Sequence, residues 1–394
     1  MRSSAASDVY KRQKRIVMYT SGKLFQERQT GGIKRFMELT KFFAREFTQT
    51  ILYSQDDDEV ATQLGIKHFV KMRKADPFYR RIPPEAALLL TNRKVIKQLR
   101  KSDYDCLVVF DVPTAIGVVL YGLKNIVLMI RKDMIGCELV NLQDRWYKSS
   151  FKLFYQWVSE AFCLWKAKSV VCQCIYDKNV LMGRHPLLAS LIDKKIKILI
   201  NNVNPSWIIS NSEQESELPT TVPIKSSRFR ICFIGGFDDS IKGQDLFLET
   251  ASELLIQRMD IEFVLIGGGF KLEEYKQMYT HENIFFTGRL KNPIKVLKTS
   301  DLLVVPSWSD SCPNTVLEAL YNEIAVIGSK AGGIPEILID KDSLFDLNKV
   351  SLKESILRFV EDNHALKLLR DRQLKRKKEL TFDWAQLMAE LVLE

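Results

Sequence analysis

The sequence predicts an α/β protein built on parallel β-sheets, and three observations support this prediction. Apolar runs of strand length recur along the chain and alternate with helical stretches. These runs are apolar throughout instead of alternating with polar residues, as in parallel strands that helices cover on both faces. The length of 394 residues is enough for two domains, each with a substantial core.

Residues 1–13 are polar, lack periodicity and resemble a non-native leader, so we exclude them from the fold prediction. The first strand is then predicted at residues 15–20. Residues 204–227 are rich in Pro, Ser, Thr and Glu and keep no strand or helix pattern, which indicates a linker. The remaining strands are predicted at 50–54, 106–110, 125–130, 169–174, 195–200, 229–235, 261–267, 283–288, 301–306 and 323–328.

Composition is that of a soluble globular protein, with 46% hydrophobic and 27% charged residues. No apolar run approaches the roughly 18 to 20 residues of a membrane span, and the start lacks the pattern of a signal peptide. We therefore expect a cytoplasmic protein. The 7 cysteines are scattered, lie mostly in apolar strands and show no zinc-site spacing, so we predict buried reduced thiols.

Charge divides between the two halves of the chain. Residues 1–205 hold 35 Lys and Arg against 19 Asp and Glu, a net charge of +16, and the remainder has a net charge of −6, which agrees with the overall +10. An anionic partner for the first half is therefore expected. Nucleic acid ranks low as that partner, because the sequence lacks zinc-finger spacing, an aromatic-rich binding motif and a basic helix with heptads.

The segment 71–101 favours an anionic membrane surface as that partner. Phe78 and Tyr79 lie there among five basic residues, Lys71, Arg73, Lys74, Arg80 and Arg81. Basic residues near anionic lipid contribute roughly 1 kcal/mol each and aromatics add interfacial contact, which is enough for reversible, peripheral attachment. The alternative is a solvated basic loop, or one that recognises an acidic soluble acceptor.

A second aromatic segment, residues 146–165, has the spacing of a helix with one apolar stripe. The stripe consists of Tyr147, Phe151, Phe154, Val158, Phe162 and Trp165. We predict that it packs in the core. The alternative is a face for a membrane or a partner protein.

Motifs that carry chemistry lie mainly in the second half. One predicted strand ends at Gly235 and Gly236, with Lys242 following at a helix start, and another ends in glycines at 267–269. The carboxyl ends of such strands can converge on one crevice. A lone glycine-rich strand end is weak evidence, because tight turns use glycine in any case.

The stretch SDSCPNTVLEAL, residues 309–320, follows a further strand and is predicted to enter a helix near Thr315. A helix start exposes free backbone amides, which bind anions. Asp310 is expected before these amides and Glu318 about one turn inside the helix, so the two carboxylates could face a polyhydroxylated anion from two sides. The alternative is a turn-forming Asp and a solvated helix Glu.

With these motifs the sequence resembles glycosyltransferase family 4, most specifically through residues 233–338. TGGIKRFMEL at 30–39 looks like that family's glycine-rich loop, and KIKILINNVNP at 195–205 like the strand before its linker. The resemblance implies the GT-B fold, in which two Rossmann-like domains with parallel sheets face each other across a cleft. The implied parts are a first domain at 14–205 with a returning helix at 380–394, a linker at 206–227 and a second domain at 228–379.

The resemblance also implies roles for individual residues. Glu318 would bind the ribose of a UDP- or GDP-sugar, Asp310 the transferred sugar and Lys242 the departing diphosphate, so these three form the catalytic set. The other implied donor contacts are Gly31, Gly32, Gly235, Gly236, Asn314, Thr315 and Val316. No cofactor is implied beyond the donor itself, and no metal, since the sequence has no Asp-x-Asp motif.

The chain departs from the family pattern at three places. Asp310 stands where the motif usually has Glu, and Gly236 stands where many relatives carry an arginine, for which Arg289 is a candidate substitute. No histidine lies near Arg131, where relatives often place one. Arg131 and Lys132 are candidate contacts of the acceptor, with surface charge as the alternative.

The function expected from these features is that of a retaining glycosyltransferase. It would move a sugar from a nucleotide sugar to a glycan or lipid-linked acceptor of a cell-surface polysaccharide or glycolipid pathway. One alternative is a nucleotide-sugar epimerase of the same fold. The other is a catalytically weak GT-B scaffold that binds a partner enzyme.

Overall fold

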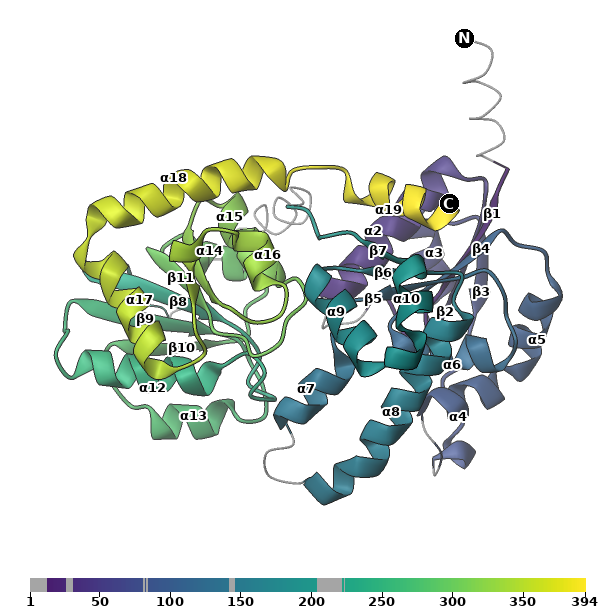
Figure 1. Cartoon of the computed structure of the whole chain (residues 1–394), viewed down its shortest axis with the longest axis horizontal. Helices are drawn as coiled ribbons and strands as arrows, with labels where there is room; N and C mark the ends of the chain where they lie inside the picture. Colours follow the sequence, from purple (N-terminus) through teal and green to yellow (C-terminus); the bar gives the residue numbers. More distant parts are fainter. Residues whose placement is uncertain are drawn as a thin grey trace, which may run out of the picture. The chain divides into compact units, whose positions relative to one another are not determined.

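The computed structural model describes residues 13–25, 31–80, 82, 84–141, 146–203, 222 and 224–394. The chain forms two compact domains (Figure 1), the first from residues 1–132, 148–199 and 383–394 and the second from residues 133–147 and 200–382. The expected leader and linker lie almost entirely outside the described residues.

The first domain contains a seven-stranded sheet with the order β3-β2-β1-β4-β5-β6-β7. All of its neighbouring strands pair in parallel. Every residue of β4 and β5 is buried, as expected for central strands that helices cover on both faces. The strands are β1 (Arg15–Tyr19), β2 (Gln49–Ser54), β3 (His68–Lys71), β4 (Cys106–Phe110), β5 (Ile126–Ile130), β6 (Ser169–Cys172) and β7 (Ile196–Ile198).

The helices of the first domain connect these parallel strands. The last helix of the chain, α19, packs on α2, and the Lys14 ammonium donates to the Leu393 carbonyl at 3.1 Å. The helices are α2 (Gly31–Glu46), α3 (Asp58–Gln63), η1 (Pro77–Tyr79), α4 (Pro84–Thr91), α5 (Arg93–Lys101), α6 (Val112–Leu120), α8 (Trp146–Lys166), α9 (Ile175–Arg184), η2 (Pro186–Leu188), α10 (Ala189–Lys195) and α19 (Trp384–Leu393).

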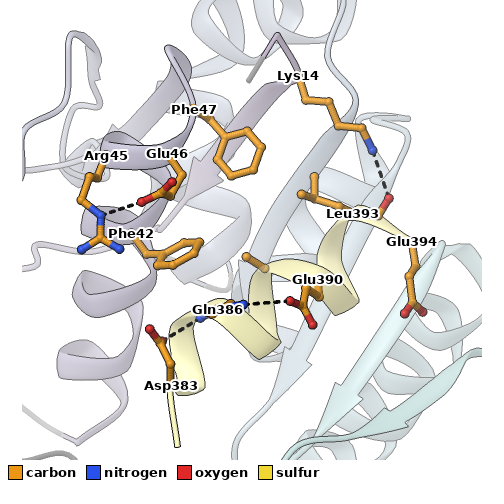
Figure 2. A pocket seen from close by; sticks show the side chains of 11 residues that line it. Lys14, Phe42, Arg45, Glu46, Phe47, Asp383, Gln386, Glu390, Leu393 and Glu394 are labelled. Atoms are coloured by element: carbon orange, nitrogen blue, oxygen red, sulfur yellow. Dashed lines mark hydrogen bonds and ion pairs between the residues drawn. The ribbon is translucent and has the colours of Figure 1, made fainter. Parts of the chain in front are cut away.

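A groove of about 740 Å³ lies beside α2 and α19 (Figure 2). Its apolar lining includes Phe42 and Phe47, and its rim carries both charges, from Lys14 to Glu390 and Glu394. None of the predicted site residues lines it, so the groove is separate from the predicted chemistry.

The second domain contains a six-stranded sheet with the order β10-β9-β8-β11-β12-β13, again parallel throughout. Its strands are β8 (Phe229–Ile234), β9 (Ile261–Ile266), β10 (Ile284–Gly288), β11 (Leu302–Val305), β12 (Ala325–Ser329) and β13 (Leu344–Phe345). Its helices are α7 (Met134–Asn141), α12 (Gln244–Leu255), α13 (Leu272–Met278), α14 (Pro293–Leu297), α15 (Asn314–Tyr321), α16 (Ile334–Leu338), η3 (Lys341–Ser343), α17 (Lys349–Glu361) and α18 (Asn363–Glu379).

Alternate residues of each second-domain strand enter two different cores. Ile231 and Phe233 join a cluster with α12, α13 and α17 on one face of the sheet, whereas Cys232 joins a cluster with α14, α15 and α16 on the other. Because successive strand residues point to opposite faces, both faces need apolar side chains. This explains why the predicted runs are apolar throughout.

The structure confirms every predicted strand and the α/β class, and it adds the short strands β3 and β13. The prediction for the aromatic stripe of α8 is wrong for most of its members: Phe162 packs against the core, but Phe151, Phe154, Val158 and Trp165 are exposed. The Tyr147 side chain lies outside the described residues. The stripe is exposed because α8 buries a different face, which includes Cys163 and Leu164.

Candidate active site

Two glycine-rich loops meet where β8 and β9 end. A Cβ built on Gly267, whose φ is +154°, would lie 1.7 Å from the carbonyl oxygen of Gly235. The amide of Phe237 donates to the carbonyl of Gly268 at 3.2 Å, so the two loops are joined through their backbones. Only glycine permits this approach at position 267, whereas a Cβ on Gly236 would meet no atom closer than 3.9 Å.

Lys242 is positioned by the glycine that follows it. Gly243 begins α12 with a φ of +73°, and a Cβ there would lie 1.9 Å from the carbonyl oxygen of Pro306. The start of α12 therefore lies directly against the loop after β11. In this position the Lys242 ammonium forms an ion pair with the Asp310 carboxylate.

The ion pair keeps Lys242 charged. Its side chain is 37% exposed and that of Asp310 only 16%. Burial by itself lowers the pKa of Lys242, but the adjacent Asp310 carboxylate outweighs burial and raises that pKa above its usual 10.5. At neutral pH the site thus holds an ammonium group whose ion-pair partner is the Asp310 carboxylate, with a further attraction from Asp239.

The backbone of Asp310 is held by the turn before α16. The Gly333 amide donates to the Asp310 carbonyl at 2.9 Å. Gly332 has a φ of +59°, and a Cβ there would lie 2.2 Å from the same carbonyl oxygen. The glycine pair in the sequence AGGIPE therefore supports Asp310.

The start of α15 offers free hydrogen-bonding groups, as the sequence predicts. Pro313 caps the helix, and the amides of Asn314 and Thr315 have no acceptor among the described residues. The amide of Val316 donates to the Pro313 carbonyl at 3.1 Å. Asn314 also has a side-chain oxygen, Oδ1, that is buried without a hydrogen-bond donor in the described structure. Such a group usually has a partner, so it indicates a ligand position.

Glu318 and Arg289 complete the predicted set in this domain. Glu318 lies half-buried in the second turn of α15, and Asp310 lies in the loop before that helix. Arg289 directly follows β10, and a Cβ on Gly268 would lie 3.2 Å from the Arg289 Cβ. Arg289 is therefore next to the glycine-rich loops. It is near Gly236, the position at which many relatives carry an arginine, but it comes from a different loop.

In the first domain the structure brings Arg131 to the start of α2. A Cβ on Gly32 would lie 1.2 Å from the Arg131 Nη1 atom, so the guanidinium in its present position lies directly against Gly32. Asp111 fixes Arg131 by accepting from its Nε at 2.9 Å and from its amide at 3.1 Å. Lys132 is exposed, and Gly31 is the first residue of α2.

Sequence reasoning missed two parts of these sites. Asp111 has a φ of +64°, which is rare for a residue with a side chain and is found mainly at functional positions. Its location at the carboxyl end of a predicted strand was the available signal. The second part is α7, which belongs to the second domain and places the Cys137 sulfur 3.8 Å from the Ser309 hydroxyl, beside Asp310. No sequence pattern indicated that contact.

No group of three or more His, Cys, Asp or Glu side chains suited to a metal ion occurs among the described residues. The predicted charged residues in the second domain's part of the site are Lys242, Arg289, Asp310 and Glu318.

Solved structures share this architecture over nearly the whole chain. HepE from Anabaena, in complex with UDP-glucose, matches with a TM-score of 0.67 at 14% identity and covers 96% of this chain and 98% of that chain. WaaG, a glycosyltransferase involved in lipopolysaccharide biosynthesis, matches with a TM-score of 0.69 at 12% identity and the same coverage. Two domains with parallel sheets and this likeness define a protein of the GT-B fold.

The second domain matches a known family. Residues 228–362 match the family described as glycosyl transferases group 1. The chain thus has the GT-B fold, and its second domain is similar to the group 1 glycosyl transferases.

Curated relatives of the chain are more similar in sequence than these structures but match a smaller part of it. N-acetyl-alpha-D-glucosaminyl L-malate synthase of Bacillus anthracis is 26% identical over 165 residues, which are 41% of each protein. The capsular polysaccharide biosynthesis glycosyltransferase CapH of Staphylococcus aureus is 26% identical over 185 residues, 45% of this chain and 48% of CapH. The chain spans about half or less of the length of the curated relatives it matches.

Proposed function

We propose that this protein transfers a sugar, with retention of anomeric configuration, from a nucleotide sugar to a glycan or lipid-linked acceptor of a cell-surface polysaccharide or glycolipid pathway. One observation carries the proposal. The Lys242–Asp310 ion pair lies beside a helix start at which Asn314 presents a free amide and a buried oxygen without a donor. A diphosphate-linked sugar has the matching chemistry: negative charge for the cation and amide, and hydroxyl groups for the oxygen acceptors.

Lys242 contributes most when the bond between sugar and diphosphate breaks. Negative charge then collects on the departing diphosphate, and a fixed ammonium is already in place to stabilise it. The free amides of Asn314 and Thr315 act in the same direction. The Val316 amide already donates to the Pro313 carbonyl and the Val316 side chain is buried in the core, so we propose no direct donor contact for Val316. Asp310 and the Asn314 Oδ1 accept hydrogen bonds from sugar hydroxyls.

The remaining residues keep the roles that the resemblance implies. Glu318 binds the ribose, and Arg289 assists Lys242 with the phosphates from beside the loops that contain Gly235 and Gly236. In the first domain Gly31 and Gly32 approach the diphosphate closely. Arg131 and Lys132 bind the acceptor, with Arg131 held in place by Asp111.

We propose a UDP-sugar as the first donor to test, because HepE was solved with UDP, with UDP and glucose, and with UDP-glucose. The protein works at the cytoplasmic face of a membrane without a metal ion. The attachment that we propose is peripheral. No described helix is long and apolar enough to cross a bilayer.

A donor screen tests the proposal. The purified protein is incubated with a panel of UDP- and GDP-sugars, with and without lipid-linked acceptors, and free nucleotide is measured in the presence of EDTA. The proposal expects nucleotide release that increases with acceptor, persists in EDTA and yields a product of the donor's anomeric configuration by NMR. Isomerised sugar without acceptor identifies an epimerase, and absence of turnover with every donor identifies a scaffold.

Glu318 provides a binding test that does not need the acceptor. Glu318→Ala should weaken UDP or GDP binding in calorimetry, because the ribose loses its carboxylate acceptor. Glu354→Ala changes an exposed residue of α17 and serves as the control. Equal nucleotide affinity of the two variants would remove Glu318 from the site.

A further inference from the structure

Helix α8 exposes an aromatic face to solvent. Phe151 is 80% and Phe154 62% exposed, and the other members of this face are between 42% and 49% exposed. We call the set the α8 aromatic face: Phe151, Phe154, Trp157, Val158 and Trp165. The spacing of 151, 154, 158 and 165 keeps these side chains on one side of the helix. Exposed apolar patches of this kind mark interaction sites in soluble proteins.

The opposite side of α8 attaches the helix to its domain. Cys163 and Leu164 belong to the core cluster of the first domain. The Lys195 ammonium donates to the carbonyls of Trp165 and Ala167, each at 2.7 Å, and so caps the carboxyl end of the helix. The helix (Figure 1) is therefore attached through this side, and its aromatic side chains are exposed on the other.

The aromatic face is also ordered by its neighbours. Trp157 stacks on Phe154 at 6.4 Å between ring centroids, and its Nε1 donates to the Arg184 carbonyl at 3.2 Å. His185, the next residue, packs against the Trp157 ring at 5.3 Å. Leu187 lies two residues further on and is fully exposed, which adds apolar surface to the same neighbourhood.

The charges around the face are positive. Lys152 and Lys166 are exposed on α8, and the Lys166 ammonium lies 3.8 Å from the centre of the Trp165 ring. Glu160 is the acidic residue of the helix, and it is buried in ion pairs with Arg184 and His185. No exposed acidic side chain of α8 thus repels an anionic surface, and residues 1–205 carry a net charge of +16.

We infer that the α8 aromatic face docks on an anionic lipid bilayer, with α8 lying in the interface. Trp and Phe are residues that anchor proteins at the boundary between headgroups and acyl chains, and lysines beside them add attraction to anionic lipid. A protein partner or a second copy would need no excess of positive charge. No described helix has the length and hydropathy of a span, so the contact is interfacial.

The basic segment 71–101 is the competing location. There the Lys71 ammonium is paired with Asp57, and an Arg73 guanidinium nitrogen donates to the Thr91 carbonyl at 3.0 Å. Phe78 is exposed, whereas Tyr79 is half-buried. Arg81 lies outside the described residues. The segment therefore presents one exposed aromatic ring where α8 presents four.

This inference rests on the proposed function in one respect, namely that the acceptor is lipid-linked. Vesicle binding is measured without nucleotide sugar or acceptor. Failure of docking would leave the transferase proposal intact, and failure of the donor screen would leave docking intact.

Co-sedimentation with vesicles tests the location. The full-length protein should pellet with phosphatidylcholine vesicles that contain phosphatidylglycerol, should not pellet with phosphatidylcholine alone, and should be released as salt rises. The Phe151→Ser/Phe154→Ser variant should lower the partition coefficient by about tenfold or more, since two aromatic contacts with the interface are lost. Phe270→Ser, at a 77% exposed ring of the second domain, is the matched control and should bind as the unmodified protein does.

Three outcomes would overturn the inference. The first is unchanged binding of the Phe151→Ser/Phe154→Ser variant while Phe78→Ser loses binding, which would move docking to segment 71–101. The second is equal recovery in the supernatant with both vesicle types. The third is a concentration-dependent dimer in sedimentation velocity that the α8 variant converts to monomer, which would make the face a contact between copies.

Tryptophan fluorescence gives an independent measurement on the same face. Trp157 and Trp165 should move from water into the interface, so emission should shift to the blue on addition of anionic vesicles. Lipids brominated near the headgroup should quench it. Trp165→Phe should reduce both signals, whereas Trp308→Phe, in the second domain, should not. Vesicle binding without any change in tryptophan emission would contradict docking through α8.

Discussion

At the scale of single residues, Lys242 depends on two neighbours for its position and its charge. Gly243 lets the start of α12 lie against Pro306, and Asp310 supplies the counter-charge. Because Asp310 raises the pKa of Lys242, the lysine binds its proton more tightly in the folded protein than in the unfolded chain. The stabilisation from this pair is therefore complete below the usual lysine pKa of 10.5 and is lost only as pH rises through the higher folded-state value.

Replacing Lys242 by Ala should lower kcat much more than it changes the donor KM. The expected loss is about 3 kcal/mol in the barrier, or roughly a hundredfold in rate, because the cation acts as the diphosphate departs. Lys242→Arg should restore part of the rate. Lys276→Ala, at an exposed lysine of α13, is the control. Equal changes in kcat and KM, measured by nucleotide release, would argue against this role.

A second residue-scale feature is the buried ion pair of Arg230 and Glu262. It joins β8 to β9 at 2.5 Å with side-chain exposures of 0% and 1%, and the Arg230 Nη1 also donates to Thr299 at 2.7 Å. Removing one partner of such a pair leaves an uncompensated buried charge. The exposed pair Arg258–Asp260 lies nearby at 2.9 Å and is a matched comparison.

Glu262→Ala should destabilise the second domain by about 3–5 kcal/mol, since it leaves the Arg230 guanidinium buried without its carboxylate. Asp260→Ala should cost no more than about 1 kcal/mol, because solvent already screens that pair. Urea denaturation followed by circular dichroism measures both. Similar midpoints for the two variants would show that Arg230 finds compensation elsewhere.

At the scale of elements, the turn before α16 holds the loop that contains Asp310. Gly332 has a positive φ, and a Cβ added to it would lie 2.2 Å from the Asp310 carbonyl oxygen. Gly122, after α6, has a positive φ of +71° and nothing within 4 Å. Substitution of Gly122 by Ala therefore measures the cost of the backbone conformation alone. Substitution of Gly332 by Ala adds the cost of a steric clash with Asp310.

Gly332→Ala should abolish most activity, and Gly122→Ala should not. Both variants carry the left-handed backbone cost of about 1–2 kcal/mol. Only Gly332→Ala also displaces Asp310, and with it the partner of Lys242. Thermal melts and donor turnover of both variants provide the measurement. A Gly332→Ala enzyme with full activity would show that the turn does not position the carboxylate.

At the scale of the whole molecule, the thiols report on the packing of both sheets. All 7 cysteines are free and buried, as the sequence predicts. Burial raises the pKa of Cys106, Cys163 and Cys232 to about 12. A raised thiol pKa means that the reactive thiolate is scarce at pH 8.

The native protein should therefore react very slowly with Ellman's reagent at pH 8, and all 7 thiols should react after denaturation. The reaction rate is expected to follow global unfolding and to increase with urea. A thiol that reacts within seconds in the native state would show that one domain opens locally. The absorbance of the released thiolate provides the count.

Local pattern was sufficient for the fold class, and it also supplied most of the residues that we propose for the site. A parallel strand covered on both faces must be apolar throughout, so each principal strand was visible in the sequence. Gly235, Lys242, Asp310 and Asn314 could be predicted because a loop that enters a helix has its own residue chemistry. An apolar strand and a loop that enters a helix are each defined by a few consecutive residues. Both can therefore be recognised from the order and spacing of residue types in the sequence.

Tertiary contacts decided the rest. The strand β3 has a polar residue at each end and β13 has only two residues, so neither forms an apolar run that a sequence pattern would show. Arg131 contacts Gly32, and Cys137 contacts Ser309. These residues are far apart in the sequence, and no local sequence pattern predicts such contacts. The spacing of residues 151–165 predicts an apolar stripe, but the neighbours that pack on a helix determine which of its sides is buried. In α8 they cover the side with Cys163 and leave the aromatic rings exposed.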